Sequence, residues 1–187
     1  MRILLSNIHW MGFNVFLALI PLAFGWLILK TRQKVLKVVY ALIWFFFLPN
    51  TLYLITDLLH IFWQWHRMHP AGQIVLALQY ITLVLIGLVT FILALYPVEK
   101  ALLSSSWPKK KSLVPVLIII TNFFLGLGIV LGRVQRINSW DILVDIPKVV
   151  TASINIFTSP ELILFVLFFA LFANVYYFLC RKSPRVS

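Results

Sequence analysis

Charged residues are scarce in this 187-residue chain, because Asp, Glu, Lys and Arg make up only 11% of it, whereas a soluble domain carries about 25%. Acids are the scarcest, with 5 Asp and Glu against 16 Lys and Arg. Hydrophobic residues supply 62% of the chain, and the mean hydropathy is +1.00. So few charges exclude a soluble globular protein and predict a membrane protein.

Cysteine is almost absent, since Cys180 is the only one. A single cysteine excludes an intrachain disulfide and every metal site that needs several cysteines. The sequence also lacks a complete catalytic motif, internal repeats and low-complexity linkers. Its N-terminal apolar run has no small-residue cleavage site and ends in a basic segment, so we expect a retained first span. We therefore expect one transmembrane domain over residues 1–187.

The positions of the charges divide the chain into five long uncharged stretches. Each is long enough to cross a hydrocarbon core of about 30 Å once. We expect an all-α polytopic protein whose five transmembrane helices lie at about residues 8–29, 38–58, 73–96, 113–133 and 161–180. We also expect a short helix at about residues 139–150, with apolar residues opposite Asp141, Asp145 and Lys148. This pattern is typical of a helix lying at the membrane surface.

Lys and Arg are divided unequally between the two sides of this topology. Eleven of the 16 lie near residues 30–37, 100–111 and 181–185, which the positive-inside rule assigns to the cytoplasm. The N-terminus should then be outside and the C-terminus cytoplasmic. The net charge of +11 is explained by this orientation and by attraction to anionic headgroups. Membrane lipids are thus the expected partners, nucleic acid is not, and oligomerisation is left open.

Pro49 lies inside the second predicted span, about 16 Å along a helix that begins at Val38, at 1.5 Å per residue. A proline at this depth removes an amide donor, and Asn50 can hydrogen-bond locally, so we expect a kink or break. Broken spans mark ligand sites in some transporters. The alternative is an ordinary kink filled by packing.

A polar stripe follows this kink, because Tyr53, Asp57, His60 and Gln64 are spaced by four, three and four residues. The Asp57 carboxylate is placed to orient the His60 imidazole, as a general base or metal ligand requires. Asp57 and His60 are therefore the candidate catalytic residues. The alternative is a helix end whose polar side chains simply meet water.

Histidines gather near the same end of the span. His60, His66 and His69 with Asp57 form a conceivable metal set. They match no recognised zinc motif, so we expect ordinary loop histidines, with no metal and no other cofactor.

The most polar segment follows the fourth span. Arg133 and Arg136, three residues apart, are able to present two guanidinium groups to a phosphate or carboxylate. Asn138 is placed to cap a helix with Asp141 reaching back from its first turn. The alternative is a capped surface helix with anchoring arginines.

Small and amide residues within the spans point to helix packing. Gly128 and Gly132 form a Gly-x-x-x-Gly motif, which allows another helix to approach closely, within the chain rather than in a dimer. Asn14, Asn122 and Asn174 lie in the first, fourth and fifth spans, where we expect hydrogen bonds between helices.

At these motifs the chain resembles a family of uncharacterised bacterial integral membrane proteins, domain of unknown function 1361. The residues that carry the resemblance are Leu48-Pro49-Asn50, Tyr53, Thr56 to His60, Gly132-Arg133 and Arg136 to Asp141. The resemblance implies a multi-pass protein of the bacterial plasma membrane and implies no activity.

The sequence therefore predicts a polar pocket in the outer leaflet. Its expected residues are Asn50, Tyr53, Asp57, His60, Arg133, Arg136, Asn138 and Asp141. The leading hypothesis is binding or transport of an anionic lipid headgroup or phosphorylated envelope precursor. One alternative is a membrane transferase or hydrolase acting on a lipid-linked substrate, with Asp57 or His60 as general base. Another is a structural or accessory subunit in which Asp57 pairs with Arg133 or Arg136.

Overall fold

The computed structural model describes residues 2–105 and 111–181, and every regular element within them is helical. The helices are α1 (Arg2–Lys30), α2 (Lys34–Phe47), α3 (Pro49–Thr56), α4 (Leu59–Trp65), α5 (Pro70–Ser104), the 3-10 turn η1 (Lys111–Leu113), α6 (Val114–Arg133), α7 (Asp141–Val144), α8 (Ile146–Thr158) and α9 (Pro160–Cys180).

Five helical stretches are long and apolar enough to cross a membrane. They are Ile3–Lys30, Lys34–Trp65, Pro70–Ser104, Lys111–Arg133 and Pro160–Cys180. An all-α, multi-pass membrane protein with five candidate spans is thus confirmed. The first three stretches run past the predicted ranges at one or both ends.

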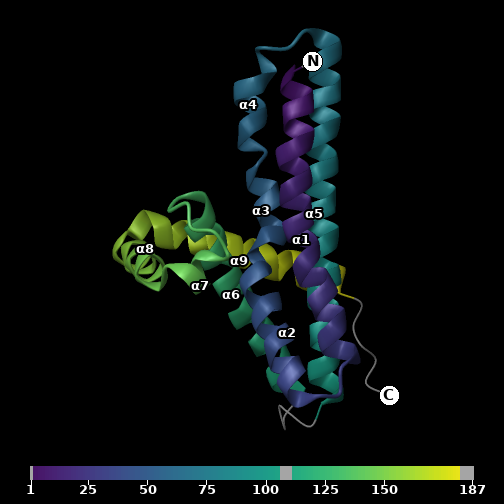
Figure 1. Cartoon of the computed structure of the whole chain (residues 1–187), viewed down its shortest axis with the longest axis vertical. Helices are drawn as coiled ribbons and strands as arrows, with labels where there is room; N and C mark the ends of the chain where they lie inside the picture. Colours follow the sequence, from purple (N-terminus) through teal and green to yellow (C-terminus); the bar gives the residue numbers. More distant parts are fainter. Residues whose placement is uncertain (1, 106–110, 182–187) are drawn as a thin grey trace.

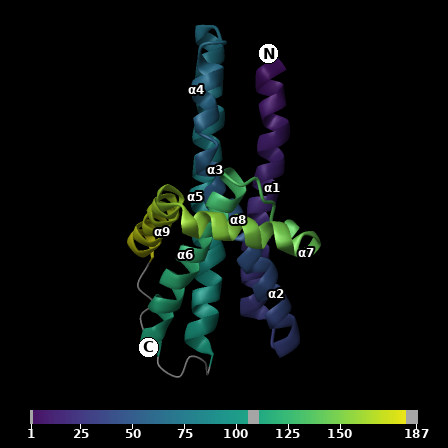
Figure 2. The same cartoon turned by 90° about the vertical axis from the view of Figure 1, so that its left-hand side faces the viewer.

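The longest helices stand upright, and the shorter helices lie beside or across them. In Figure 1, α1, α5 and the α2–α3–α4 column stand side by side, α6 lies beside the lower part, and α9 runs across the middle. The 35 residues of α5 span about 52 Å, and the 20 residues of α6 about 30 Å, at 1.5 Å per residue. Arg133, the last residue of α6, therefore lies beside the middle of the α2–α3–α4 column and α5. Figure 2 shows α8 running across the upright helices at this height.

The predicted break at Pro49 is confirmed. Helix α2 ends at Phe47 and α3 begins at Pro49, with Leu48 between them. The backbone amide of Thr51 donates to the Leu48 carbonyl rather than to Phe47. The side-chain amide of Asn50 donates to the Phe47 carbonyl at 3.0 Å instead. The Asn50 side chain thus supplies a partner for the Phe47 carbonyl at the break.

Glycines of α6 bring this helix against two neighbours. A Cβ on Gly128 would collide with the ring of Pro49, and one on Gly126 would lie 2.5 Å from the Val166 carbonyl oxygen of α9. The glycines therefore serve packing within the chain. The side chain of Asn122 also donates to Asn174 of α9 at 2.9 Å, so the expected hydrogen bond between these helices is confirmed.

A second break, which the sequence did not predict, separates α3 from α4 at Asp57 and Leu58. Beyond it, Gln64 turns to α1 and pairs with Asn7 through two amide hydrogen bonds of 2.8 and 3.1 Å. The predicted continuous stripe from Tyr53 to Gln64 is therefore wrong in its outer part.

A buried acid ties α5 to α9 at the other end of the molecule. The Glu99 side chain is 3% exposed and pairs with Arg181 at 2.5 Å. The hydroxyl of Tyr177 donates to the second Glu99 oxygen at 2.7 Å. The sequence identified Arg181 only as an indicator of orientation, and this pair was not predicted.

The surface helix predicted at about residues 139–150 is wrong in its bounds. Two helices occupy the region, α7 and the longer α8, and they are separated at Asp145, whose carboxylate accepts from the Lys148 amide at 3.1 Å. Pro147 occupies the first turn of α8, where proline is favourable. Helix α8 exposes an apolar stripe of Ile146, Val150, Ile154 and Phe157.

Candidate functional site

Asp57 and Arg133 meet where α3 and α6 end. Arg133 donates from Nη1 to Oδ1 of Asp57 at 3.1 Å and from Nη2 to the Thr56 carbonyl at 3.0 Å. The second carboxylate oxygen accepts from the Asn14 side chain of α1 at 3.0 Å. The Asp57 side chain is only 3% exposed. The carboxylate is thus fully engaged in joining three helices.

His60 lies beside this ion pair without a direct bond to the carboxylate. Its Nδ1 is 4.0 Å from Asp57 Oδ1, but 3.2 Å from the Asp57 carbonyl and 3.3 Å from Arg133 Nη2. The imidazole ring also contacts Trp10, with ring centroids 5.6 Å apart. The expected carboxylate–imidazole hydrogen bond is therefore not formed.

Arg136 has a different environment from Arg133. Helix α6 ends at Arg133, so the helical spacing assumed for the two arginines does not apply. Arg136 has a φ of 53°, the only positive φ among the described residues other than glycine. It is exposed, and its side chain makes no hydrogen bond or ion pair within the described parts of the chain. Left-handed backbone is uncommon for a residue with a side chain and often marks a functional position.

Asp141 closes the loop between α6 and α8. Its carboxylate accepts from the Asn138 backbone amide at 2.9 Å and from Lys148 Nζ at 3.1 Å. The expected reach-back to Asn138 is confirmed, although α7 begins only at Asp141. The pKa of Asp141 is held below its usual value, mainly by the hydrogen bond from the Asn138 backbone amide and next by the hydrogen bond from Lys148. This carboxylate shapes the loop.

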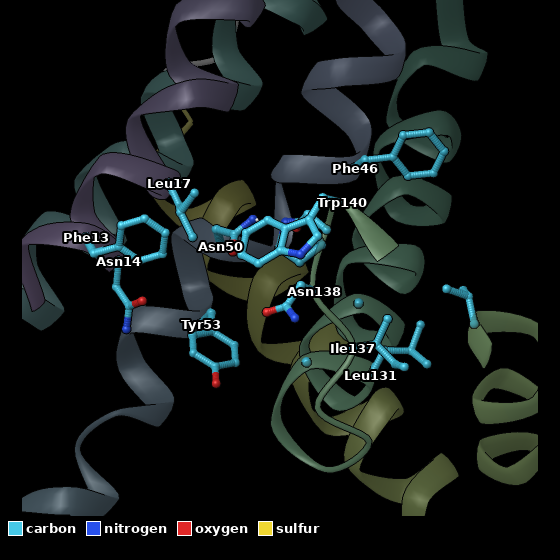
Figure 3. Close-up of a pocket in the computed structure, with 15 residues that line it drawn as sticks. Phe13, Asn14, Leu17, Phe46, Asn50, Tyr53, Leu131, Ile137, Asn138 and Trp140 are labelled. Atoms are coloured by element: carbon cyan, nitrogen blue, oxygen red, sulfur yellow. Dashed lines mark hydrogen bonds between the residues drawn. The ribbon is translucent and has the colours of Figure 1, made fainter. Parts of the chain in front are cut away.

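A cavity of about 160 Å³ lies beside the ion pair, between α1, the α2–α3 break, α6 and the loop leading to α8. Figure 3 shows Asn138 and Trp140 between Phe13, Leu17 and Tyr53 on one side and Leu131 and Ile137 on the other. The residues that line it are Phe13, Asn14, Leu17, Phe46, Pro49, Asn50, Tyr53, Gly128, Leu131, Gly132, Ile137, Asn138, Ser139, Trp140 and Val149.

Three of the expected site residues line this cavity: Asn50, Tyr53 and Asn138. The other five do not. Asp57, His60 and Arg133 form the neighbouring ion-pair cluster, Asp141 closes the loop, and Arg136 directly precedes the lining residue Ile137. The structure thus separates the predicted pocket into a cavity and a supporting cluster.

Two amide oxygens at the cavity have no partner in the described structure. The Asn14 amide nitrogen donates to the Asp57 carboxylate, and the Asn50 nitrogen donates to Phe47 O and Ser139 Oγ. Because the Asp57 and Phe47 oxygens only accept, the two amide groups have a fixed orientation. Their Oδ1 atoms are left as free acceptors.

Tyr53, Asn138 and Trp140 add further polar atoms. The Tyr53 hydroxyl and the Trp140 indole N–H make no hydrogen bond to any described residue, whereas the Asn138 side chain interacts with the Asp141 carboxylate. The Tyr53 ring instead lies near Arg133, with the guanidinium carbon 5.7 Å from the ring centroid. No charged residue lines the cavity. The cavity therefore offers uncharged donors and acceptors on apolar and aromatic walls.

Several residues that line the cavity were not predicted from the sequence. Asn14 was expected only to join helices, and Trp140 was not among the expected site residues. The amides in spans were the available signal, since an uncharged polar side chain within an apolar stretch needs a partner. Phe13, Leu17 and Phe46 gave no signal, because the neighbouring residues are equally apolar.

The histidines do not gather into a metal site. Among the described residues, no group of three or more His, Cys, Asp or Glu side chains is close enough to hold a metal ion. His69 Nδ1 instead accepts from the Gly72 amide at 3.3 Å and so caps α5.

Comparison with known proteins gives one match. The sequence model of the family described as "Protein of unknown function (DUF1361)" matches residues 13–175, a range that includes every residue lining the cavity. No curated protein and no solved structure matches the chain.

Proposed function

Because the chain belongs to the DUF1361 family, whose description assigns no function, we propose one from the site: the protein binds the headgroup of an anionic membrane lipid in the cavity beside α3 and α6. The observation that carries this proposal is an accessible cavity with unpartnered polar atoms, directly preceded in the chain by the unpaired Arg136. Such convergence of a few polar groups on apolar walls is typical of small-molecule sites.

The height of the cavity supports a headgroup as the ligand. Helices α6 and α9 have 20 and 21 residues, about the length that crosses a hydrocarbon core of about 30 Å. The cavity lies near the end of α6, where Asp57, Arg133 and Asp141 also lie. Helix α8 crosses here with an exposed apolar stripe, as a helix at the membrane surface would. Measured along α6, the cavity lies at the depth of lipid headgroups. Measured along the candidate spans Ile3–Lys30 and Lys34–Trp65, it lies near the middle, so we propose that a headgroup enters from the side of α6 and α8.

Arg136 supports a phosphate as the anionic part. Arg133 is paired with Asp57, and Lys148 with Asp141, so their charges are largely compensated. Arg136 has no such partner in the described structure. Its guanidinium group is able to bind a phosphate through two parallel hydrogen bonds.

The uneven distribution of Lys and Arg supports an outward-facing cavity, and the family resemblance is the basis for placing the protein in a bacterial plasma membrane. With the N-terminus outside, the ligand is an anionic lipid or phosphorylated envelope precursor in the outer leaflet. The α2–α3 break borders the cavity, which is the position of ligand sites in transporters with broken helices. We therefore propose transport of the bound lipid as a second step beyond binding.

The geometry gives less support to an enzyme. Both Asp57 oxygens are engaged and the side chain is buried, so a substrate in the cavity does not reach this candidate base. An accessory subunit is the second candidate function, favoured by the ion pair that joins α3 to α6.

The proposal is tested with Arg136→Gln and a matched control, Arg67→Gln, which removes another exposed arginine away from the cavity. Anionic lipid retained by the purified protein is measured by native mass spectrometry. We expect wild type and Arg67→Gln to retain it and Arg136→Gln to retain roughly tenfold less, the usual effect of losing a charge-assisted hydrogen bond. Absence of anionic lipid from wild type, or unchanged retention in Arg136→Gln, contradicts the proposal.

A further inference from the structure

We infer that the part of the headgroup inside the cavity is a single hydroxylated ring, a sugar or cyclitol, with the lipid phosphate outside at Arg136. This inference rests on the proposed function, because it names the chemical class of the headgroup that the same site takes. It comes from the size of the cavity, its free acceptors and its lack of charge.

The cavity has room for one six-membered ring. Its volume is about 160 Å³, close to the ~150 Å³ cavity that accommodates benzene in an engineered protein. A drug-sized ligand fills roughly 300 Å³ or more. The volume therefore suits one ring and excludes an entire lipid.

The free acceptors require a ligand that donates hydrogen bonds. Asn14 Oδ1 and Asn50 Oδ1 have fixed orientations and no partner in the described structure. An ionised phosphate offers acceptors only, so it leaves both oxygens unpaired. A hydroxyl donates one hydrogen bond and accepts others. Hydroxyl groups therefore match these acceptors and also the donors on Tyr53 and Trp140.

The absence of charge in the lining excludes an ionic group inside the cavity. An ammonium group, such as that of ethanolamine, donates hydrogen bonds but needs a carboxylate partner when it leaves water. The nearest buried carboxylate, Asp57, is already held by Arg133 and Asn14. A neutral polyol avoids this cost, and the apolar faces of a ring suit walls such as Phe13 and Leu17.

The surroundings explain how such a ring would remain attached to a lipid. Val149 of α8 lines the cavity, and the adjacent Val150 belongs to the exposed apolar stripe. Arg136 stands one residue before Ile137, which also lines the cavity. In this arrangement the ring occupies the polar cavity and the phosphate binds Arg136. The acyl chains then lie against the apolar surface of α8.

The test compares lipids that separate these features. The full chain in phosphatidylcholine nanodiscs is offered phosphatidylinositol, which carries a ring and a phosphate, or phosphatidic acid, which has the phosphate alone. Phosphatidylglycerol supplies an acyclic polyol, phosphatidylethanolamine an ammonium group, and monoglucosyl diacylglycerol a ring without charge. Binding is measured as lipid retained per chain. We expect phosphatidylinositol to be bound at least roughly tenfold more tightly than the other phospholipids, as a few added hydrogen bonds allow.

Two variants connect this preference to the cavity. Tyr53→Phe removes a hydroxyl without a partner in the described structure, whereas Asn138→Ala also removes a side-chain interaction with Asp141, so the thermal unfolding temperature of both variants is measured beside that of wild type. Asn155→Ala is the matched control, because Asn155 is exposed and away from the cavity. We expect Tyr53→Phe and Asn138→Ala to reduce binding of phosphatidylinositol several-fold, leaving phosphatidic acid unchanged, and Asn155→Ala to behave as wild type.

The outcomes separate the two proposals. Equal binding of all anionic lipids contradicts the ring and leaves the proposed function standing. Binding of monoglucosyl diacylglycerol with no preference for anionic lipids supports the ring and overturns the anionic headgroup. Soluble inositol 1-phosphate that competes as well as the lipid supports the ring chemistry and contradicts a lipid source. Tighter binding of phosphatidylethanolamine than of phosphatidylinositol overturns the inference.

Discussion

Arg133 donates to the Asp57 carboxylate across 76 positions of sequence, at 3.1 Å. The bond joins the last residue of α6 to the residue at which α3 ends. It also positions the Tyr53 ring, which lines the cavity and lies near the same guanidinium group. We interpret this ion pair as the support on which the cavity is built.

Removing one partner of this pair should destabilise the protein. Asp57→Ala leaves Arg133 without its buried counter-charge, and breaking such a pair costs about 3–5 kcal/mol. We expect a marked fall in the thermal unfolding temperature in detergent, and partial recovery in the charge-swapped double variant Asp57→Arg with Arg133→Asp. Glu161→Ala, which removes an exposed acid, is the control. Strictly additive losses in the double variant would show that the two residues do not interact.

The glycine at the helix break should be intolerant of any side chain. Gly128→Ala places a methyl group against the Pro49 ring, and overpacking of this kind costs about 1–3 kcal/mol. Gly12→Ala is a matched control, since an added Cβ there meets nothing within 4 Å. Thermal unfolding should separate the two variants, with only Gly128→Ala destabilised. If both variants unfold at the same temperature, α6 lies farther from the Pro49 break than it does in the structure.

The loop between α6 and α8 should loosen in acid. The pKa of Asp141 is held below its usual value of 3.8 by the Asn138 amide and Lys148. A lowered pKa contributes stability that is fully present above the usual value and is lost as the pH falls through the folded value. We expect the anisotropy of a fluorophore on Val144→Cys, with Cys180→Ser, to fall only below about pH 4.

The variant Asp141→Asn provides the comparison for this loop. An amide has no ionisation to lose, so the labelled loop should show the same low anisotropy at neutral and acidic pH. Anisotropy in the original loop that stays constant with pH would contradict the role assigned to Asp141.

The proposed orientation has a test of its own, since Cys180 is the only cysteine and is exposed at the end of α9. An impermeant maleimide should label it in inverted vesicles and leave it unlabelled in intact cells. Val144→Cys in a Cys180→Ser chain should give the opposite result. If Cys180 is instead labelled in intact cells, the cavity faces the cytoplasm and its ligand belongs to the inner leaflet.

The spans were predictable because charge placement is a strong constraint in lipid, and the break followed from Pro49 because proline has no amide donor. The break at Asp57 was not predictable, since neither proline nor glycine is there. The pairing of Asp57 with Arg133 was anticipated as one of two arginine partners. The structure shows that α6 ends at Arg133, so Arg136 belongs to the loop that follows and Arg133 is the partner of Asp57.

The cavity itself could not be derived from the sequence. Its walls come from α1, α2, α3, α6, the following loop and α8, so it depends on the relative registers of helices whose surfaces are largely apolar. Asn14 illustrates this limit, because its amide in a span predicted a partner without identifying Asp57. The pairing of Glu99 with Arg181 was missed for the same reason.

Filling the cavity is the most direct test of its role as the headgroup site. Val149→Trp places an indole in the cavity from α8, and Val150→Trp places the same group on the exposed face one residue away. The measurement is anionic lipid retained per purified chain, by native mass spectrometry. The account predicts that Val149→Trp retains little or none while Val150→Trp retains as much as wild type. Undiminished retention in a folded Val149→Trp chain would contradict it.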